Sequence, residues 1–144
     1  MTIIRSYGGS EQQLGIYDLA TNKIENLTDT AIFSSGVFTE DGKILTLTSA
    51  KSDKNEFTKI CMLDPNKPKK LKVIYNPEFE IGSFFYDRQL HVIFMNLNKD
   101  GYSLPKIIDL KGNEIPFPEV GIGIVAEISS NDSGDVVLDR KSVV

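Results

Sequence analysis

The sequence is poor in the side chains on which catalytic and metal centres most often depend. Its 144 residues include no Trp, one His and one Cys. The single Cys61 excludes an intrachain disulfide, which favours a reducing compartment, so we expect a cytoplasmic protein. No apolar run approaches about 18 residues and no charged-then-apolar leader opens the chain, so we expect neither membrane insertion nor export.

An excess of positive charge is also lacking. The formal net charge is −4 at pH 7, which argues against a nucleic-acid partner because phosphate binding needs a positive surface. The one basic cluster, Lys67, Lys69, Lys70 and Lys72, is expected to be a solvated turn and strand edge. A hydrophobic content of 40% with 25% charged residues fits one ordinary soluble domain with a core of its own.

What the chain does contain is a repeat. Asp18, Asp64 and Asp109 each end a short apolar run, and they are 46 and 45 residues apart. A second set has the same two spacings, lies in turn-like stretches and follows the first set by 23 residues: Asp41, Asp87 and Asp132. A period near 45 residues built from short strands is typical of a β-propeller blade. We predict an all-β fold, a partial β-propeller of about three four-stranded blade repeats. The first set is expected at equivalent ends of third strands, and the second set in equivalent turns between first and second strands.

Alternating and β-branched runs predict the strands within each repeat. First strands are expected at residues 35–38 and 81–85, second strands at 44–48 and 90–95, third strands at 57–63 and 104–110, and fourth strands at 71–75 and 114–117. Polar stretches at 50–56 and 96–102 are expected to be loops. Pro116 and Pro118 suit an outer edge, where a missing backbone donor is tolerated.

Both ends of the chain fall inside repeats. The start supplies second, third and fourth strands, and the end supplies a first and a second strand: 2–4, 14–19, 23–27, 123–128 and 136–138. We therefore predict a single β-propeller-like domain over residues 1–144, divided into an incomplete blade 1–30, a blade 31–76, a blade 77–119 and a half blade 120–144. Closed propellers need roughly four to eight blades, so about three repeats cannot close a ring.

Two outcomes follow from the missing blades. In the first, the chain is a fragment or a truncated relative of a larger propeller. In the second, the half blade at the end of one copy is completed by the strands at the start of another copy, as in a domain swap. The second outcome predicts self-association through exposed blade edges. The sequence leaves both open, because any cut that ignores blade boundaries leaves complementary ends.

Two stretches carry a family resemblance. Residues 38–44 read Phe-Thr-Glu-Asp-Gly-Lys-Ile, and residues 16–23 read Ile-Tyr-Asp-Leu-Ala-Thr-Asn-Lys before a strand that closes in Leu27-Thr28. This grammar resembles the propeller domains of prolyl-oligopeptidase-type serine peptidases, including acylaminoacyl and dipeptidyl peptidases, and the periplasmic Tol-type propeller. The second repeat has Asp-Arg-Gln at 87–89 in place of Asp-Gly-Lys, so its turn is expected to be one residue shorter or differently shaped. WD repeats are disfavoured because Trp and a Gly-His pair are absent.

The resemblance implies a gating or scaffold module rather than an enzyme. In such peptidases a separate α/β-hydrolase domain carries the Ser, Asp and His, and this chain has no Gly-x-Ser-x-Gly elbow. His91 is expected in the strand 90–95, packed on the sheet. We therefore predict no catalytic, cofactor-binding or metal-binding residue, no cofactor, and a hydrolase domain or a peptide as the partner besides a second copy.

The remaining candidates are interpreted structurally. The stretch 130–135 resembles part of a sialidase Asp-box but is expected to be a hairpin turn whose Asp and Asn side chains bond nearby amides. A calcium site is opposed by adjacent Arg140 and Lys141, although three carboxylates come close together in the sequence: Asp132, Asp135 and Asp139. Cys61 is expected to be a buried small hydrophobe. The densest aromatic stretch is expected to be inter-blade core: Phe79, Phe84, Phe85 and Tyr86.

Three functions remain in play from the sequence. The leading one is a non-catalytic propeller related to the gating domain of an oligopeptidase. The second is a stand-alone protein-interaction propeller formed by self-association. The third is a carbohydrate-active, sialidase-like propeller, which would need inward-facing Arg and acidic clusters.

Overall fold

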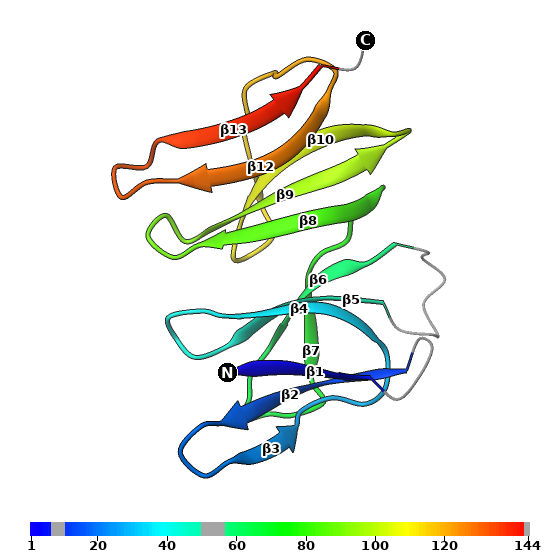
Figure 1. Ribbon diagram of the computed structural model, residues 1–144, viewed down its shortest axis with the longest axis vertical. Helices are drawn as coiled ribbons and strands as arrows, with labels where there is room; N and C mark the ends of the chain where they lie inside the picture. Colours follow the sequence, from blue (N-terminus) through cyan, green and yellow to red (C-terminus); the bar gives the residue numbers. More distant parts are fainter. Residues whose placement is uncertain (7–10, 50–56, 143–144) are drawn as a thin grey trace. The chain divides into compact units, whose positions relative to one another are not determined.

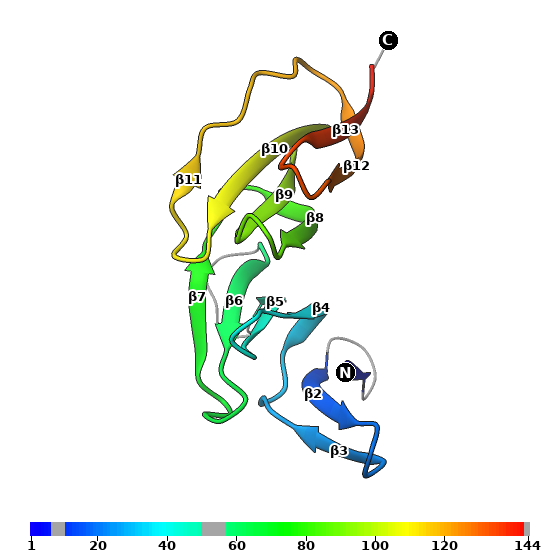
Figure 2. The ribbon, with the colours of Figure 1, turned by 90° about the vertical axis from the view of Figure 1, so that its left-hand side faces the viewer.

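A computed structural model describes residues 1–6, 11–49 and 57–142, and these residues form strands and turns with no helix (Figures 1 and 2). The strands belong to four antiparallel sheets of blade size. The prediction of an all-β, partial propeller is confirmed. The chain divides into two compact units, residues 1–76 and 77–144. The loop expected at 50–56 lies outside the described residues.

The first unit holds a three-stranded and a four-stranded sheet. The three-stranded sheet has the order β1 (Thr2–Ser6), β2 (Gln12–Asp18), β3 (Lys23–Asn26). The four-stranded sheet has the order β4 (Ile32–Phe38), β5 (Ile44–Ser49), β6 (Lys59–Leu63), β7 (Leu71–Tyr75). One buried cluster joins both sheets: Leu14, Leu27, Ala31, Phe33, Ile44 and Leu63. Buried Thr28 accepts a hydrogen bond from the Leu14 amide at 2.9 Å, which explains why the fourth strand closes in Leu-Thr.

The second unit holds a four-stranded and a two-stranded sheet. The four-stranded sheet runs from β8 (Glu80–Asp87) through β9 (Val92–Lys99) and β10 (Tyr102–Asp109) to β11 (Glu114–Ile115). The two-stranded sheet pairs β12 (Ile124–Ser130) with β13 (Val136–Lys141). The apolar alternation of the central strands buries one face of the larger sheet: Ile81, Ile93, Met95, Leu97 and Ile108. Pro116 and Pro118 follow β11 and lie outside the strands.

The prediction of a loop at 96–102 is wrong. Strand β9 continues to Lys99 and β10 begins at Tyr102, which pairs with it, so only Asp100 and Gly101 form the turn. Both have positive φ, 52° and 84°, as a two-residue turn of type I′ requires, and Asp-Gly is a preferred sequence for that turn. Residues 96–99 therefore belong to a long hairpin, and Asn96 lies within the sheet.

The first set of aspartates occupies equivalent positions, as predicted. Asp18 and Asp109 are the last residues of β2 and β10, and Asp64 directly follows β6. In each case Oδ1 accepts a hydrogen bond from the backbone amide two residues later, at 2.9, 2.9 and 2.8 Å. This Asx turn starts the hairpin toward the fourth strand, so the three carboxylates have the same structural role.

The second set of aspartates lies in the turns between first and second strands, as predicted, but not at the same position within those turns. The first position of the three turns is taken by Thr39, Asp87 and Asn131, each at the end of a first strand or just after it. Asp41 stands third in its turn and Asp132 stands second in its turn. The turns themselves are equivalent, because all three join a first strand to a second strand.

His91 is not in a strand, and its turn is one residue longer than the other two. Asp87 pairs directly with Val92, which leaves four residues between them, whereas Asn131 is bonded to Asp135 across three. His91 is exposed and has a φ of 52°, where the other turns have Gly42 at 76° and Gly134 at 84°. The turn with the extra residue and the left-handed His91 takes the place of the Asp-Gly-Lys turn. Because His91 is exposed in this turn, the prediction that its imidazole packs on the sheet is wrong.

Each first strand is bulged at the same place. The pairing register shifts between Phe33 and Gly36 in β4, between Ile81 and Ser83 in β8, and after Val125 in β12. The residue just before each bulge is buried: Phe33, Ile81 and Val125. A bulge bends and twists its strand, so these three strands curve in the same way after their buried residue.

Candidate functional site

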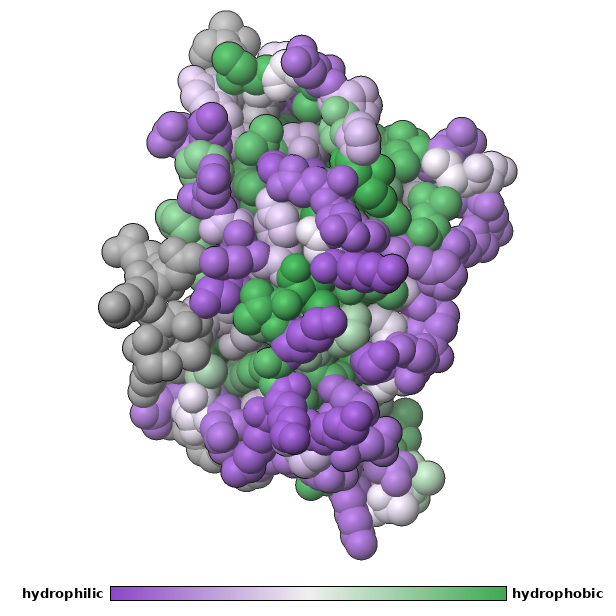
Figure 3. Space-filling view, turned by 180° about the vertical axis from the view of Figure 1, so that it is seen from behind, coloured by the Kyte–Doolittle hydropathy of each residue, from purple (hydrophilic) through white to green (hydrophobic). Residues whose placement is uncertain are grey.

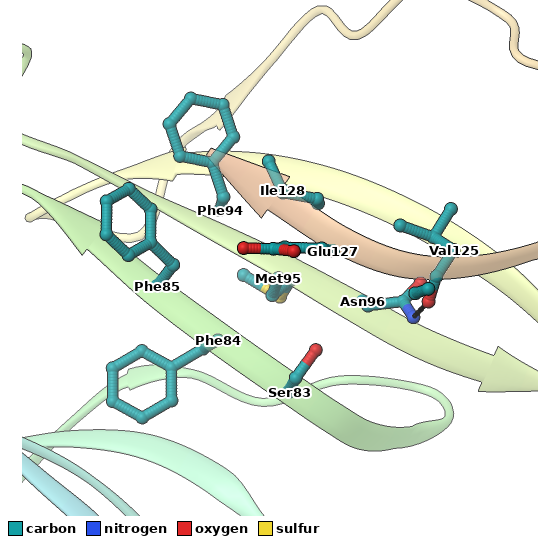
Figure 4. A pocket seen from close by; sticks show the side chains of 10 residues that line it. Ser83, Phe84, Phe85, Phe94, Met95, Asn96, Val125, Glu127 and Ile128 are labelled. Atoms are coloured by element: carbon teal, nitrogen blue, oxygen red, sulfur yellow. Dashed lines mark hydrogen bonds between the residues drawn. The ribbon is translucent and has the colours of Figure 1, made fainter. Parts of the chain in front are cut away.

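The second unit contains a cavity of about 200 Å³ between its two sheets (Figure 4). Three segments line it: 83–85 on β8, 94–96 on β9 and 125–128 on β12. Both β8 and β12 are first strands, and each carries its bulge next to the cavity. The cavity therefore lies between two equivalent strands, next to the bulge of each.

Two phenylalanine rings form one wall of the cavity. Phe85 on β8 is the cross-strand partner of Phe94 on β9, and their rings stack with centroids 6.2 Å apart and an interplanar angle of 27°. Phe94 is 1% exposed and Phe85 is 42% exposed, so one ring is fixed in the core while the other presents a face to solvent. Tyr86 is buried as expected for core, but the same expectation is wrong for Phe85.

A polar clamp fixes β12 against the larger sheet. The Asn96 Nδ2 group donates to the Val125 carbonyl at 3.2 Å and to Ser103 Oγ at 3.1 Å. Ser103 Oγ also accepts a hydrogen bond from the Val125 amide at 2.8 Å, and the Ser103 amide donates to the Gly123 carbonyl at 2.9 Å. Because buried hydrogen bonds between strands rigidify their packing, the cavity walls are held in place without a ligand.

Glu127 is the charged side chain of the cavity. In Figure 4 its carboxylate points from β12 toward the side on which the rings of Phe85 and Phe94 lie. Within the described part of the chain, no hydrogen bond or ion pair engages this carboxylate. Glu127 is exposed, so it remains accessible to a ligand that enters from solvent.

A second contact between the sheets involves a buried carboxylate. Asp87 is 6% exposed, and its Oδ1 accepts hydrogen bonds from the amides of Gln89 and Leu90 at 2.8 and 2.9 Å. Its Oδ2 accepts a hydrogen bond from Ser130 Oγ on β12. The Leu90 amide and then the Ser130 hydroxyl hold the pKa of Asp87 below its ordinary value, so this carboxylate stays ionised. Its role is to cap the turn and to anchor β12.

The other residues considered from the sequence are distributed over the fold. Cys61 is 2% exposed on β6, as expected for a buried hydrophobe. The stretch 130–135 is a hairpin turn, in which Asn131 Oδ1 accepts from the amides of Ser133 and Asp135 at 2.9 Å. Across residues 1–6, 11–49 and 57–142, no group of three His, Cys, Asp or Glu side chains is arranged to hold a metal ion.

The surface carries its charges in a dispersed way. The four lysines of the basic cluster are exposed, and Lys69 forms an ion pair at 2.9 Å with Asp29, which is exposed as well. Figure 3 shows hydrophobic residues that reach the surface between the hydrophilic ones. Among the described residues there is no helix long and apolar enough to cross a membrane.

Comparisons with known proteins identify the fold. No family model and no curated protein matches the chain. A solved prolyl endopeptidase, from a study of inter-domain dynamics in catalysis and specificity, matches 95% of this chain with a TM-score of 0.72 and 18% identity. TolB from Acinetobacter baumannii matches 77% of the chain with a TM-score of 0.55 and 19% identity. The chain spans 21% of the endopeptidase and 27% of TolB. It is a propeller that resembles those domains, as the sequence predicted.

Proposed function

We propose that this chain is a non-catalytic β-propeller module related to the gating or scaffold domain of an oligopeptidase-type serine peptidase. The observation that carries the proposal is the likeness to the prolyl endopeptidase propeller over nearly the whole chain. The Asx turns at Asp18, Asp64 and Asp109 support it, because they form the turn after the third strand that the sequence pattern of such blades contains.

The chemistry of the described residues fits a role without catalysis. A serine or cysteine hydrolase needs a nucleophile within hydrogen-bond reach of a base that a third group orients. Cys61 is buried in the first unit, and His91 is an exposed turn residue in the second unit. We propose that the partner is a hydrolase domain or the peptide it admits, and that the protein works in the cytoplasm.

The test combines the coding sequence with an assay. We expect the reading frame around these 144 codons to encode an α/β-hydrolase with a Gly-x-Ser-x-Gly elbow. The longer polypeptide should cleave a chromogenic proline-containing peptide, and residues 1–144 alone should not exceed the blank. Turnover by residues 1–144 that disappears in His91→Ala would contradict the proposal.

A second candidate function is a protein-interaction propeller formed by self-association. The observation that favours it is the two-stranded sheet, in which β13 has β12 as its hydrogen-bonded neighbour within the described strands. Its apolar side chains are also exposed, with Val136 at 38% and Val137 at 66%. An unpaired apolar edge strand is a template for another strand, so we propose that a second copy pairs there.

Light scattering with size exclusion tests this candidate. We expect a dimer at micromolar concentration. Such a stable interface should bury more than about 1,000 Å² of surface. Val137→Lys should yield a monomer because it places a charge on the pairing strand. Val73→Lys on β7, which is 51% exposed, is the matched control and should leave the mass unchanged. A monomeric wild-type chain would rule out this second candidate and leave the first intact.

A further inference from the structure

The cavity between β8 and β12 has the chemistry of a binding site for a cation with an apolar body. We propose that it binds a primary ammonium group carried on a phenyl-sized or alkyl group. This inference rests on the cavity alone and does not depend on the proposed gating function.

Charge and aromatic character select the ligand. The Glu127 carboxylate has no cationic partner within the described residues, and Lys and Arg are absent from the cavity lining. The rings of Phe85 and Phe94 lie on the side toward which this carboxylate points (Figure 4). An ammonium group is attracted both by a carboxylate and by the negative face of an aromatic ring, whereas an anion is repelled by both.

The size of the cavity limits the apolar body. An apolar cavity of about 150 Å³ accommodates benzene, so the 200 Å³ found here holds a phenyl group with a short amine arm or a lysine side chain. Phe94 is 1% exposed and closes the inner side of the cavity, while the more exposed Phe85 and Glu127 mark the open side. The ligand would enter with its apolar end first and leave its ammonium group at Glu127.

The walls are arranged before the ligand arrives. The Asn96–Ser103 clamp on Val125 and the Asp87–Ser130 contact hold β12 at two points that flank Glu127 in sequence. A preorganised site loses less conformational entropy on binding than a mobile one. Ammonium binding therefore requires little more than the ordering of the Glu127 side chain.

The experiment titrates the purified chain with 2-phenylethylammonium chloride and follows backbone amide shifts by ¹H–¹⁵N NMR. The neutral analogue 2-phenylethanol separates charge from shape. We expect shifts on β8, β9 and β12, and binding of the amine about ten-fold tighter than binding of the alcohol. Glu127→Gln should remove that ten-fold preference, whereas Glu78→Gln, an exposed carboxylate outside the cavity lining, should retain it.

A lysine arm distinguishes the source of the ammonium group. The tripeptide acetyl-Ala-Lys-Ala-amide should shift the same amides if the site takes lysine side chains, and only the free amine should do so if it takes small amines. Either result supports the proposal. Equal binding of amine and alcohol, equal binding by wild type and Glu127→Gln, or no shift on these strands with any probe would overturn it.

Discussion

Replacing Asp87 with alanine tests whether the turn between β8 and β9 is built on a buried carboxylate. The change deletes two hydrogen bonds from the amides of Gln89 and Leu90 and one from Ser130 Oγ. It therefore removes the cap of one turn and one of the contacts between β8 and β12.

The magnitude follows from these three bonds. Each hydrogen bond to a charged group contributes about 1.5–3 kcal/mol, but water replaces the partners at the exposed turn amides, so the net loss is about 2 kcal/mol. For a chain of this length such a loss lowers the melting temperature by roughly 4–8 °C. We expect Asp87→Asn to lose less, because its amide oxygen still accepts from the turn.

Circular dichroism at increasing temperature measures the effect, and the matched control is Asp132→Ala. Asp132 is an exposed aspartate in the turn between β12 and β13, and it has the same place as Asp87 in the sequence repeat. Among the described residues no hydrogen bond engages its side chain, so its removal should change stability by less than about 0.5 kcal/mol. Equal losses for Asp87→Ala and Asp132→Ala would refute the reasoning.

The pH dependence gives a second measure of the same carboxylate. The pKa of Asp87 in the folded chain lies below its ordinary value of 3.8, so the folded state binds its proton less readily than the unfolded state does. Its contribution to stability is present above pH 3.8 and is lost as the pH falls through the lower, folded pKa. Asp87→Asn should therefore unfold with a shallower acid dependence below pH 3.8 than the wild type.

Three further outcomes are expected. The Lys43 ammonium holds the pKa of Asp41 at about 2, so Lys43→Met should raise the midpoint of the Asp41 carboxyl titration, followed by NMR, toward 3.8. An unchanged midpoint would show that the ion pair is not the cause of the lowered pKa. Gly101→Ala, at a φ of 84°, should cost about 1 kcal/mol in urea unfolding, and Gly82→Ala, without a positive φ, should cost less; the reverse order would contradict the turn assignment. His91→Val should lower the melting temperature while His91→Asn preserves it, because Asn tolerates the left-handed region; a neutral valine would argue against that backbone.

The parts of the fold that depend on local chemistry could be predicted from the sequence. An Asx turn needs only one carboxylate and the amide two residues later, so Asp18, Asp64 and Asp109 marked equivalent turns correctly. The alternation of apolar residues predicted the strands, because one face of each sheet is buried. The fourth strand at 71–75 was predicted with the bounds that β7 has.

The parts that depend on backbone conformation could not be predicted. The turns between first and second strands need a polar cap first and a left-handed residue just before the second strand, and the cap is Thr39, Asp87 or Asn131. Aligning the repeats by their aspartates therefore matched residues that have different positions within these turns. A positive φ at His91 could not be predicted from its residue type, because Gly and Asn are the residues at which a positive φ is expected.

The cavity was also beyond the reach of the sequence. Which of Phe85 and Tyr86 faces the core depends on the bulge at Gly82, which resets the alternation of side chains along β8. Glu127 lies beside the two rings only because β12 is held against β9 and β10. Side chains from strands about 40 residues apart meet there, and no local pattern records such a meeting.

The bulges in β4, β8 and β12 also bear on aggregation. Each of these strands is the terminal strand of its sheet, so each presents a row of backbone donors and acceptors that another chain can recruit. The bulge interrupts that row and twists the strand away from a flat approach, which makes these three edges poor templates for fibril growth. A repeat protein in which similar strands recur needs such protection at every copy, and here each copy of the first strand carries its own.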